Sequence, residues 1–574
     1  MKVHRSMGAR QRRAYGRVPG RLIAIILVIT QTLVISCIRT APLSFAAQTP
    51  GSLAPSNTPF QPLHWTAEPT VTSTNAPPTA TPVPTPSPYS IWLAPYLIDT
   101  LGDQIALPDE WGFTSDPVNA AAQIKVGEEN RVGQWIYALV VPFPTISDGV
   151  SAQDLLRAWK GELDGLFGGA PLLMAESTLE AISAYWGEPA PGVVRTSPAS
   201  ELLDKAWEQR PSWAIIPFEE LQPRWKVFEV DGISPIHKNF DISDYELSIP
   251  ISLIGEPPED LSIPESNRNP NKLTTLVMTG VTALVRATAF TMEREGVNYP
   301  AQDIVHWLAG ADITHISNEV PFATDCPYPN PVQQDMRFCS CDKYIGLLEE
   351  VGTDIVELTG DHFGDWGAGA MLHTLEMYAQ EGWLTYGGGS NIQEGRKAVI
   401  VEHNGNRMAF LGCNAKGGGY AGAGQSNPGA VGCDFTWMTA EIERLDDEGI
   451  LPIVTFQHFE YYTYAAQANQ QRDAQRMTSE GAVIVSGSQA HHPQALEFSN
   501  GGFVHHGLGN LFFDQFDVST GTRQAFIDRH ILYDGRHIST ELLTIMFVDY
   551  ARPRPMTPEE RSALLEAVFS ASGW

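Results

Sequence analysis

Short apolar runs alternate with longer amphipathic segments through residues 272–550, and this alternation limits the fold more than any other feature of the chain. The expected strands are Leu273–Thr279, Ile313–Ser317, Asp354–Leu358, Met408–Cys413, Leu451–Phe456 and Ala482–Val485. The expected helices, with apolar residues at helical spacing, are Ala301–Leu308, Tyr344–Val351, Ala370–Glu381, Met438–Asp446 and Ala465–Thr478. Repeated βα units are typical of a layered α/β domain, so we expect one here.

Acidic residues and histidines follow these expected strands. In layered α/β folds, reactive side chains gather on loops at the carboxyl ends of the strands. The strand-end residues here are Glu319, the group Asp361, His362 and Asp365, the pair His458 and Glu460, the pair His491 and His492, and further on His505 and His506. Carboxylates and imidazoles from separate loops are the ligands that a divalent metal site needs. The sequence therefore predicts such a site at one end of the domain.

Four motifs, in this order along the chain, carry a resemblance to a known family. Residues 317–321 read Ser-Asn-Glu-Val-Pro, and residues 359–367 read Thr-Gly-Asp-His-Phe-Gly-Asp-Trp-Gly. Residues 387–394 read Gly-Gly-Gly-Ser-Asn-Ile-Gln-Glu, and residues 506–515 read His-Gly-Leu-Gly-Asn-Leu-Phe-Phe-Asp-Gln. The four resemble the motifs N-L-E-T-P, A-N-N-H-x-x-D-x-G, G-A-G-x-N-x-x-E and Y-S-L-G-N-F-x-F-D-Q of the CapA family, which are capsule and poly-γ-glutamate synthesis accessory proteins. The resemblance covers residues 272–515 and implies the α-β-β-α layers of the calcineurin-like metallophosphoesterase fold.

The chain departs from the family pattern at positions that would carry metal ligands. The family's opening G-D is Gly280-Val281 here, and a valine side chain cannot bind a metal. The family's G-H-H-P-H is Gly487-Ser488-Gln489-Ala490-His491, and its H-W-G-x-E is the shorter His458-Phe459-Glu460. A two-metal centre needs several bridging oxygens and imidazoles. We therefore expect one divalent ion rather than two, and a site that is degenerate for hydrolysis.

The resemblance implies roles for individual residues. The expected metal ligands are Glu319, Asp361, His458, Glu460 and His491. His362 is expected to act as a general acid or base, with Asp365 orienting its ring. The residues expected to contact substrate are Lys416, His506 and Asn510. The alternative is that Asp361 and Asp365 cap the helix that begins near Gly367, with His362 bonded to backbone.

A glycine-rich run follows the expected strand Met408–Cys413. Residues 417–422 match G-x-G-x-x-G, but no helix is expected directly after them, so a dinucleotide-binding fingerprint lacks its required context. We expect instead a mobile flap over the site, tied by a disulfide between Cys413 and Cys433. Lys416, at the base of this flap, would meet an anionic substrate, unless it is simply a solvated lysine.

The first 40 residues have the pattern of a secretory signal or membrane anchor. Residues 1–36 contain seven Lys or Arg and no acidic residue, and residues 22–38 are an uncharged apolar run. The run ends in Val34-Ile35-Ser36-Cys37, which resembles a bacterial lipobox with Cys37 as the lipidated residue. An uncleaved anchor of 17 residues is the alternative. Either way, the body of the protein is expected on the extracytoplasmic side of the cell membrane.

Residues 41–88 are rich in Pro, Thr and Ser, which predicts an extended linker. Beyond it lie five cysteines, and disulfides are the default expectation outside the cytoplasm. We favour Cys413 with Cys433, and Cys326 with either Cys339 or Cys341. A zinc site of cysteines alone is less favoured, because Cys339 and Cys341 are separated by a single residue.

Residues 89–255 are predicted to form a separate mixed α/β domain. Its expected strands are Trp135–Val141, Ala214–Phe218 and Trp225–Val230, and its expected helices are Ala152–Leu166 and Ala199–Glu208. The segment 140–148 with the helix after it loosely resembles half of a periplasmic solute-binding domain, in which a Thr/Ser turn and a helix N-terminus hold an anion. A structural or docking role is the other interpretation. Residues 551–574 are expected to end the chain in a helix.

The charge of the chain limits its partners. The formal net charge is −29, which argues against nucleic-acid binding. The resemblance implies a role in synthesis, export or anchoring of an anionic surface polymer, in contact with that polymer or with capsule synthase components. Metal-assisted hydrolysis or transfer, a catalytically degenerate scaffold, and an anion- or solute-binding lipoprotein remain as alternatives.

Overall fold

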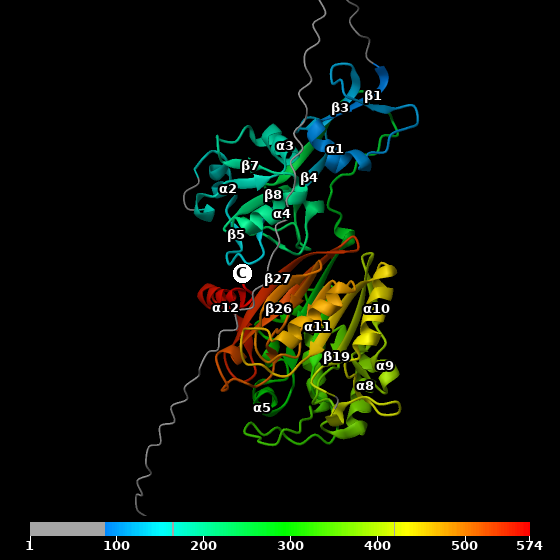
Figure 1. The fold of residues 1–574 in the computed structure, drawn as a ribbon, viewed down its shortest axis with the longest axis vertical. Helices are drawn as coiled ribbons and strands as arrows, with labels where there is room; N and C mark the ends of the chain where they lie inside the picture. The colour runs from blue at the N-terminus through cyan, green and yellow to red at the C-terminus, as the bar shows by residue number, and fades with distance from the viewer. Residues whose placement is uncertain (1–86, 163–165, 418) are drawn as a thin grey trace, which may run out of the picture. The chain divides into compact units, whose positions relative to one another are not determined.

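The computed structural model describes residues 87–162, 166–417 and 419–574. The predicted anchor with Cys37, and the predicted linker up to residue 86, lie outside these residues. Within the described part of the chain, no helix combines the length and the apolar character needed to cross a bilayer. The structure is α/β throughout, as predicted (Figure 1).

The first sheet of the carboxyl-terminal part is built around parallel strands. β12, β14, β15 and β16 pair in parallel, β12 then pairs antiparallel with β26, and the order ends β26-β27-β28. The short strand β13 joins β14 to β25. The bounds are β12 (Leu273–Thr279), β13 (Val281–Thr282), β14 (Ile313–Asn318), β15 (Ile355–Glu357), β16 (Leu384–Tyr386), β25 (Asn510–Phe512), β26 (Gln524–Tyr533), β27 (Arg536–Phe547) and β28 (Pro553–Pro555).

The second sheet has the order β18-β19-β21-β22-β24-β23, and its inner pairs are parallel. The bounds are β18 (Val399–His403), β19 (Asn406–Asn414), β21 (Leu451–Gln457), β22 (Ile484–Ser486), β23 (Leu496–Ser499) and β24 (Gly502–His505). A small separate ladder joins β17 (Gly388–Gly389) to β20 (Gly429–Ala430).

Alternating side chains divide the apolar residues into three layers. Leu276 and Met278 of β12 lie in one core with Phe410 of β19 and Ile453 of β21, so the two sheets pack face to face. Val277, between them in sequence, lies in a second core on the opposite face of the first sheet, as the period of two in a strand requires. The helices of that outer layer are α5 (Arg286–Glu295), α6 (Val305–Leu308), α7 (Ile345–Glu350) and α8 (Gly367–Glu381).

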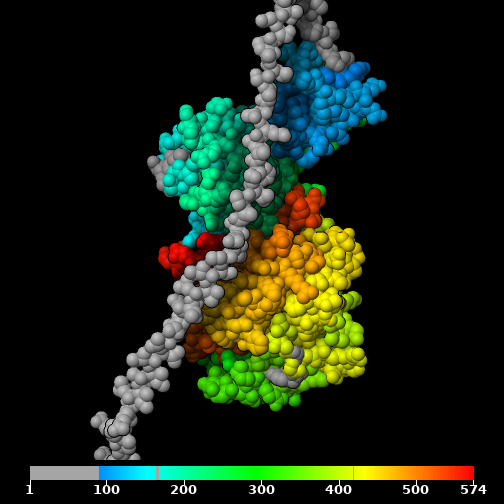
Figure 2. Space-filling view, viewed as in Figure 1, coloured from blue at the N-terminus to red at the C-terminus, as the bar shows by residue number. Residues whose placement is uncertain are grey.

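The outer face of the second sheet is covered by α10 (Phe435–Asp447) and α11 (Ala468–Ser479), whose buried residues form a third core with β19 and β21. In the space-filling view these segments form a continuous yellow-to-orange surface (Figure 2). The short α9 (Ile392–Gly395) lies beside β17. The layer order is thus α-β-β-α, the order that the family resemblance implies.

Residues 87–255 form another sheet, in the order β2-β1-β3-β11-β4-β8-β6-β7, with β9 paired to β4. Its strands are β1 (Ser87–Leu93), β2 (Gly112–Thr114), β3 (Ala120–Val126), β4 (Arg131–Pro142), β6 (Leu172–Met174), β7 (Val194–Thr196), β8 (Trp213–Pro217), β9 (Trp225–Val227) and β11 (Ser248–Gly255), while β5 (Gly149–Val150) pairs with β10 (Glu229–Val230). Its helices are α1 (Ile98–Leu101), α2 (Ala152–Trp159), α3 (Glu176–Trp186) and α4 (Ala199–Glu208).

Two local outcomes differ in detail from the sequence analysis. The helix expected over residues 152–166 ends at Trp159, because Gly161 has a left-handed φ of 96° that ends the helical path. The expected linker boundary at residue 88 falls inside β1, which begins at Ser87. The last helix, α12 (Pro558–Ala571), begins where the sequence predicts, with a capping box between Thr557 and Glu560.

The cysteine pairing follows the sequence-based preference. Disulfides join Cys326 to Cys339 and Cys413 to Cys433, and Cys341 is left as a free thiol. The Cys413–Cys433 bond connects the end of β19 to the residues just before α10. It closes the segment that contains the glycine-rich run, of which residue 418 lies outside the described residues.

Candidate metal centre

The polar residues predicted to form a site come from loops at the carboxyl ends of parallel strands in both sheets. Glu319 directly follows β14, and Asp361 with His362 lie in the loop between β15 and α8. From the second sheet, Lys416 lies just beyond β19, and Glu460 follows β21 by three residues. His491, beyond β22, completes the cluster. Parallel strands therefore bring residues more than 170 positions apart in sequence to one edge.

Glu319 lies at the centre of this cluster and is 1% exposed. Its Oε1 atom is 3.8 Å from Nε2 of His491 and 3.5 Å from Nε2 of Gln457. Gln457 is the one side chain that donates a hydrogen bond to this carboxylate within the described residues, and the bond is long. Burial raises the pKa of Glu319 above its ordinary value. A buried carboxylate with so few donors is a site where a cation stabilises the charge.

His491 presents a free ring nitrogen to Glu319 because its other nitrogen is held from behind. Nδ1 of His491 lies 2.8 Å from Oδ1 of Asn510. The amide nitrogen of Asn510 donates to the carbonyl oxygens of Thr522 at 3.0 Å and of His491 at 3.3 Å, which fixes the amide oxygen toward the imidazole. The Nδ1–H of His491 therefore donates to Asn510, and Nε2 keeps a lone pair. An imidazole oriented in this way is typical of a metal ligand.

His362 is fixed by Asp365, which is 3% exposed. Nδ1 of His362 lies 2.8 Å from Oδ2 of Asp365, and the same oxygen accepts the backbone N–H of Phe338 at 2.8 Å. Burial acts to lower the pKa of His362, but the bond to Asp365 and the charge of Glu319 outweigh it and raise the pKa to about 9. The ring is therefore cationic at neutral pH and directs Nε2–H away from Asp365.

Helix capping, the alternative role for the two aspartates, is not what the structure shows. The residue before α8 is Trp366, and no side chain of the described residues caps that helix. Asp365 instead orients His362, as the family resemblance implies.

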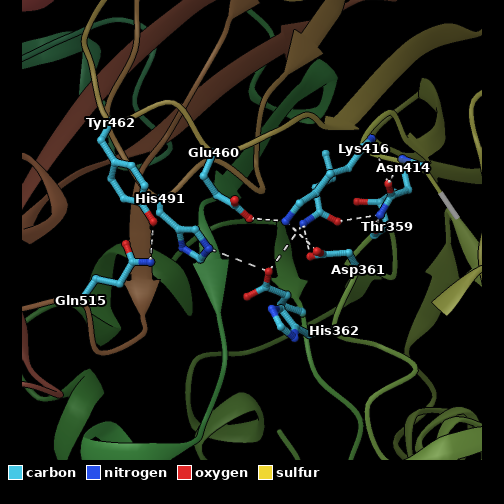
Figure 3. Close-up of polar contacts among 12 residues, drawn as sticks. Thr359, Asp361, His362, Asn414, Lys416, Glu460, Tyr462, His491 and Gln515 are labelled. Atoms are coloured by element: carbon cyan, nitrogen blue, oxygen red, sulfur yellow. Dashed lines mark hydrogen bonds and ion pairs between the residues drawn. The ribbon is translucent and has the colours of Figure 1, made fainter. Parts of the chain in front are cut away.

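Asp361 has both carboxylate oxygens occupied (Figure 3). Oδ2 lies 2.6 Å from Nζ of Lys416, and Oδ1 accepts a 2.7 Å hydrogen bond from Nε2 of Gln457. Lys416 also contacts Oε1 of Glu460, so its ammonium lies between the two carboxylates. Burial would raise the pKa of Asp361, but the hydrogen bond and charge of Lys416 hold it below its ordinary value.

Within this cluster, two overlapping sets of side chains are close enough to hold a metal ion. One is Glu319, Glu460 and His491, the other is Glu319, Asp361 and His362, and within each set the ligand atoms lie within 4.8 Å of one another. The two sets share Glu319. In the first set, Nε2 of His491 is open toward the cluster and one oxygen of Glu460 contacts Lys416, whereas in the second set each oxygen of Asp361 already has a partner.

Three residues predicted for the site lie elsewhere. Nε2 of His458 is 3.1 Å from Oδ2 of Asp473 on α11, on the outer side of the second sheet. Nε2 of His506 is 3.5 Å from Glu497 on β23. Asn510 is fully buried behind His491 and supports that imidazole.

Gln457 is the site residue that the sequence analysis did not single out. It is the last residue of β21, and successive residues of a strand point to opposite faces, so Gln457 faces Glu319 and Asp361 while His458 faces Asp473. The sequence signal for Gln457 is the spacing between His458 and Glu460, which is shorter than the spacing between the histidine and the glutamate of the family motif. Gln457 lies three residues before Glu460 and His458 only two, so Gln457 is nearer to the spacing of the first histidine in H-W-G-x-E.

The other departures from the family pattern are filled by neutral contacts. Val281 on β13 is fully buried in a small apolar cluster with Val320, Phe338 and Phe513. Ser488 donates to the buried carboxylate of Glu357, which Thr359 also bonds at 2.6 Å. Gln489 donates to Ser317 at 2.6 Å. Ser488 and Gln489 therefore use their polar atoms on neighbouring side chains, and Val281 packs among apolar residues, so none of the three is placed as a metal ligand.

The turn in residues 140–148, considered as an anion site, is occupied by the protein itself. Nζ of Lys226 donates to the carbonyl oxygens of Thr145 and Ser147 at 2.8 and 2.6 Å and lies 2.6 Å from Asp148. The first N–H groups of α2 bond to Asp231 and to the capping residue Ser151. These groups therefore serve internal contacts.

The fold and the cluster together define a layered α-β-β-α domain with carboxylates and imidazoles at the strand ends. Residues 275–515 match the family described as "Bacterial capsule synthesis protein PGA_cap". This part of the chain is thus similar to the bacterial capsule synthesis proteins of that family. The chain is 23% identical over 301 residues to the capsule biosynthesis protein CapA of Bacillus anthracis, a match that covers 51% of this chain and 72% of that protein.

Similarity to solved structures is weak. The 5'-nucleotidase precursor from Thermus thermophilus aligns with 52% of this chain and 58% of its own, at a TM-score of 0.31 and 13% identity. An ABC-type phosphate transport receptor from Vibrio cholerae aligns with 29% of this chain and 86% of its own, at a TM-score of 0.24 and 14% identity. At these scores neither likeness assigns an activity.

Proposed function

We propose that this protein assists the synthesis, export or anchoring of an anionic capsule polymer of the poly-γ-glutamate type. The family match over residues 275–515 and the similarity to a capsule biosynthesis protein support the association with capsule synthesis. The observation that carries the proposal furthest is the buried, poorly bonded carboxylate of Glu319 beside the oriented imidazole of His491.

One divalent cation fits the first ligand set. Glu319 and Glu460 offer carboxylate oxygens and His491 offers Nε2, a mixed O/N set that suits zinc, manganese or iron(II). Asn510 orients the ring of His491 through a hydrogen bond to Nδ1, as residues behind a metal-binding histidine commonly do. A divalent ion bound there would polarise a phosphoryl or acyl oxygen.

His362 supplies a second positive charge, next to the proposed metal ion. Its imidazolium, held by Asp365, directs Nε2–H toward Glu319, where it can donate a hydrogen bond or a proton to an anionic group. A formal net charge of −29 repels a polyanion unless a local cation intervenes. The metal ion and His362 would give this otherwise acidic protein its attraction for such a polymer.

A scaffold without turnover is the second candidate, and specific contacts favour it. Val281 places a methyl-bearing side chain where the family has a carboxylate, and both oxygens of Asp361 are already bonded. A single ion without the second ligand set binds an anionic group but lacks the paired clamp of a two-metal hydrolase. Under this candidate the polymer or a synthase component binds at the cluster and is not cleaved.

A comparison of variants separates the two candidates. The full chain, purified in mild detergent and dialysed against Mn²⁺, is expected to retain a single ion per chain by elemental analysis. Glu319→Gln and His491→Ala should lose it, whereas His373→Ala, on the partly exposed side of α8, should not. Turnover of a phosphoester or of poly-γ-glutamate that the same two variants abolish would support hydrolysis, and metal binding without turnover would support the scaffold. Wild-type protein that binds no metal would contradict the cation site.

We further propose that the folded part lies on the extracytoplasmic side, anchored through residues 1–40. The apolar run 22–38, the lipobox-like sequence ending at Cys37 and the two disulfides among the described residues support this location.

A further inference from the structure

Lys416 is the one lysine or arginine that contacts the cluster within the described residues, and its position is fixed by backbone contacts. Its N–H and that of Gly417 donate to Oδ1 of Asn414 at 3.0 and 3.1 Å. Asn414 in turn donates to the carbonyl oxygen of Thr359 at 2.8 Å and to Oε1 of Gln457 at 2.9 Å. The start of the Lys416 side chain is therefore tied to the ends of β15, β19 and β21.

The ammonium of Lys416 occupies the gap between the two metal-binding sets. It lies 2.6 Å from Oδ2 of Asp361, which belongs to one set, and contacts Oε1 of Glu460, which belongs to the other. The lysine side chain is 17% exposed, so water screens these contacts only partly.

The position of Lys416 limits the cluster to one divalent ion. Its ammonium lies against carboxylates of both sets, and each oxygen of Asp361 already has a partner. A second ion would have to displace the ammonium from Asp361, at high electrostatic cost.

We propose that Lys416 is a built-in cation that takes the place of a second metal ion. The site then binds one divalent ion, at Glu319, Glu460 and His491, and the ammonium of Lys416 fills the position beside Asp361 that would otherwise be open to another. This inference rests on the proposed cation site. It gives Lys416 a fixed structural charge, in place of the free lysine for substrate that the sequence suggests.

The test compares metal stoichiometry in full-length wild type, Lys416→Met and Lys416→Arg. Each protein is titrated with Mn²⁺ and followed by calorimetry and by electron paramagnetic resonance, which detects magnetic coupling between neighbouring Mn²⁺ ions. We expect about one ion per chain in wild type and Lys416→Arg, and about two in Lys416→Met, with a coupled spectrum in that variant alone. If Lys416→Met fails to fold, Lys416→Gln carries the same expectation.

Two results would overturn the inference. One is a Lys416→Met protein that still binds a single uncoupled ion, which would leave the proposed cation site intact. The other is a wild-type protein that binds two coupled ions. Wild type and Lys416→Met that both bind none would instead contradict the cation site itself, so the two failures are distinguishable.

Discussion

At the scale of single residues, the site depends on which atom of each side chain is already bonded. His491 has one nitrogen on Asn510 and one open, whereas Asp361 has none of its oxygens open. The same residue types would give a different site if these partners were exchanged. Knowing the residue types from the sequence is therefore not enough to define the metal site. The hydrogen bonds that each side chain makes to its other neighbours decide which lone pairs remain for a metal ion.

Asn510 provides a direct test at this scale. Asn510→Leu removes the acceptor for Nδ1–H of His491, and we expect it to weaken Mn²⁺ affinity by about 10- to 100-fold. Asn510→Asp keeps an acceptor oxygen and should bind at least as tightly as wild type. Calorimetric titration of the two variants, alongside circular dichroism to verify folding, measures the effect. Equal losses in both variants would contradict a role for the acceptor oxygen and would point to the amide nitrogen that bonds Thr522 and His491.

At the scale of elements, the sequence predicts the parallel strands well because each is a short apolar run with a clear end. The expected strands Leu273–Thr279 and Leu451–Phe456 correspond to β12 and β21 to within one residue. The long hairpin β26–β27 was missed. The dipeptide Asp534-Gly535 is a sequence signal for such a hairpin turn, and both residues have the positive φ angles, 50° and 73°, that this turn requires.

The sequence predicts the part of the candidate site that lies directly at the ends of parallel strands. Glu319, Asp361, His362, Glu460 and His491 do come together at one edge. His458 does not, because it follows Gln457 directly and neighbouring residues at the end of a strand point to opposite faces. The sequence placed Asn510 at the site but as a substrate contact, and the roles of Asn510 and Gln457 as supporting residues follow only from their hydrogen-bond partners.

The last helix offers a pH-dependent prediction at the scale of elements. Glu560 in the capping box of α12 bonds both guanidinium nitrogens of Arg554, at 2.6 and 2.8 Å, and these bonds lower its pKa from 4.5 to about 2. A lowered pKa in the folded state stabilises the protein above the ordinary pKa, and the stabilisation is lost as pH falls from 4.5 toward 2.

We therefore expect Glu560→Gln, which keeps the capping hydrogen bonds, to be less stable than wild type at pH 7. The difference should shrink as the pH is lowered from 4.5 to about 2. Urea unfolding at several pH values measures it. Glu559→Gln, in the same helical turn but without an ion pair among the described residues, is the matched control. A difference that stays constant with pH would contradict the role of the Glu560 charge.

At the scale of the whole molecule, the amino-terminal segment and the folded part both favour a location outside the cytoplasm. Two disulfides within residues 326–433 suit an oxidising compartment, and a basic, then apolar, first segment suits export. The acidic body and the cation-dependent site proposed above would then face the surface polymer directly.

Protease added to intact cells tests this location. With a tag at the C-terminus of the full chain, we expect the tag to be digested without lysis. Labelling of cells with a radioactive fatty acid should mark the wild type but not Cys37→Ala if Cys37 carries the lipid, and should mark neither if the apolar run is an uncleaved anchor. A tag that is protected until the cells are lysed would contradict the proposed location.

The hairpin β26–β27 has a consequence for how the chain unfolds. Neighbouring residues Ile531 and Leu532 belong to different cores: Ile531, with Tyr533 and Ile538, packs among residues of 91–251, whereas Leu532 packs between the two sheets of the carboxyl-terminal part. We therefore expect that loosening of either core removes packing from the same strand, so that unfolding of one core weakens the other.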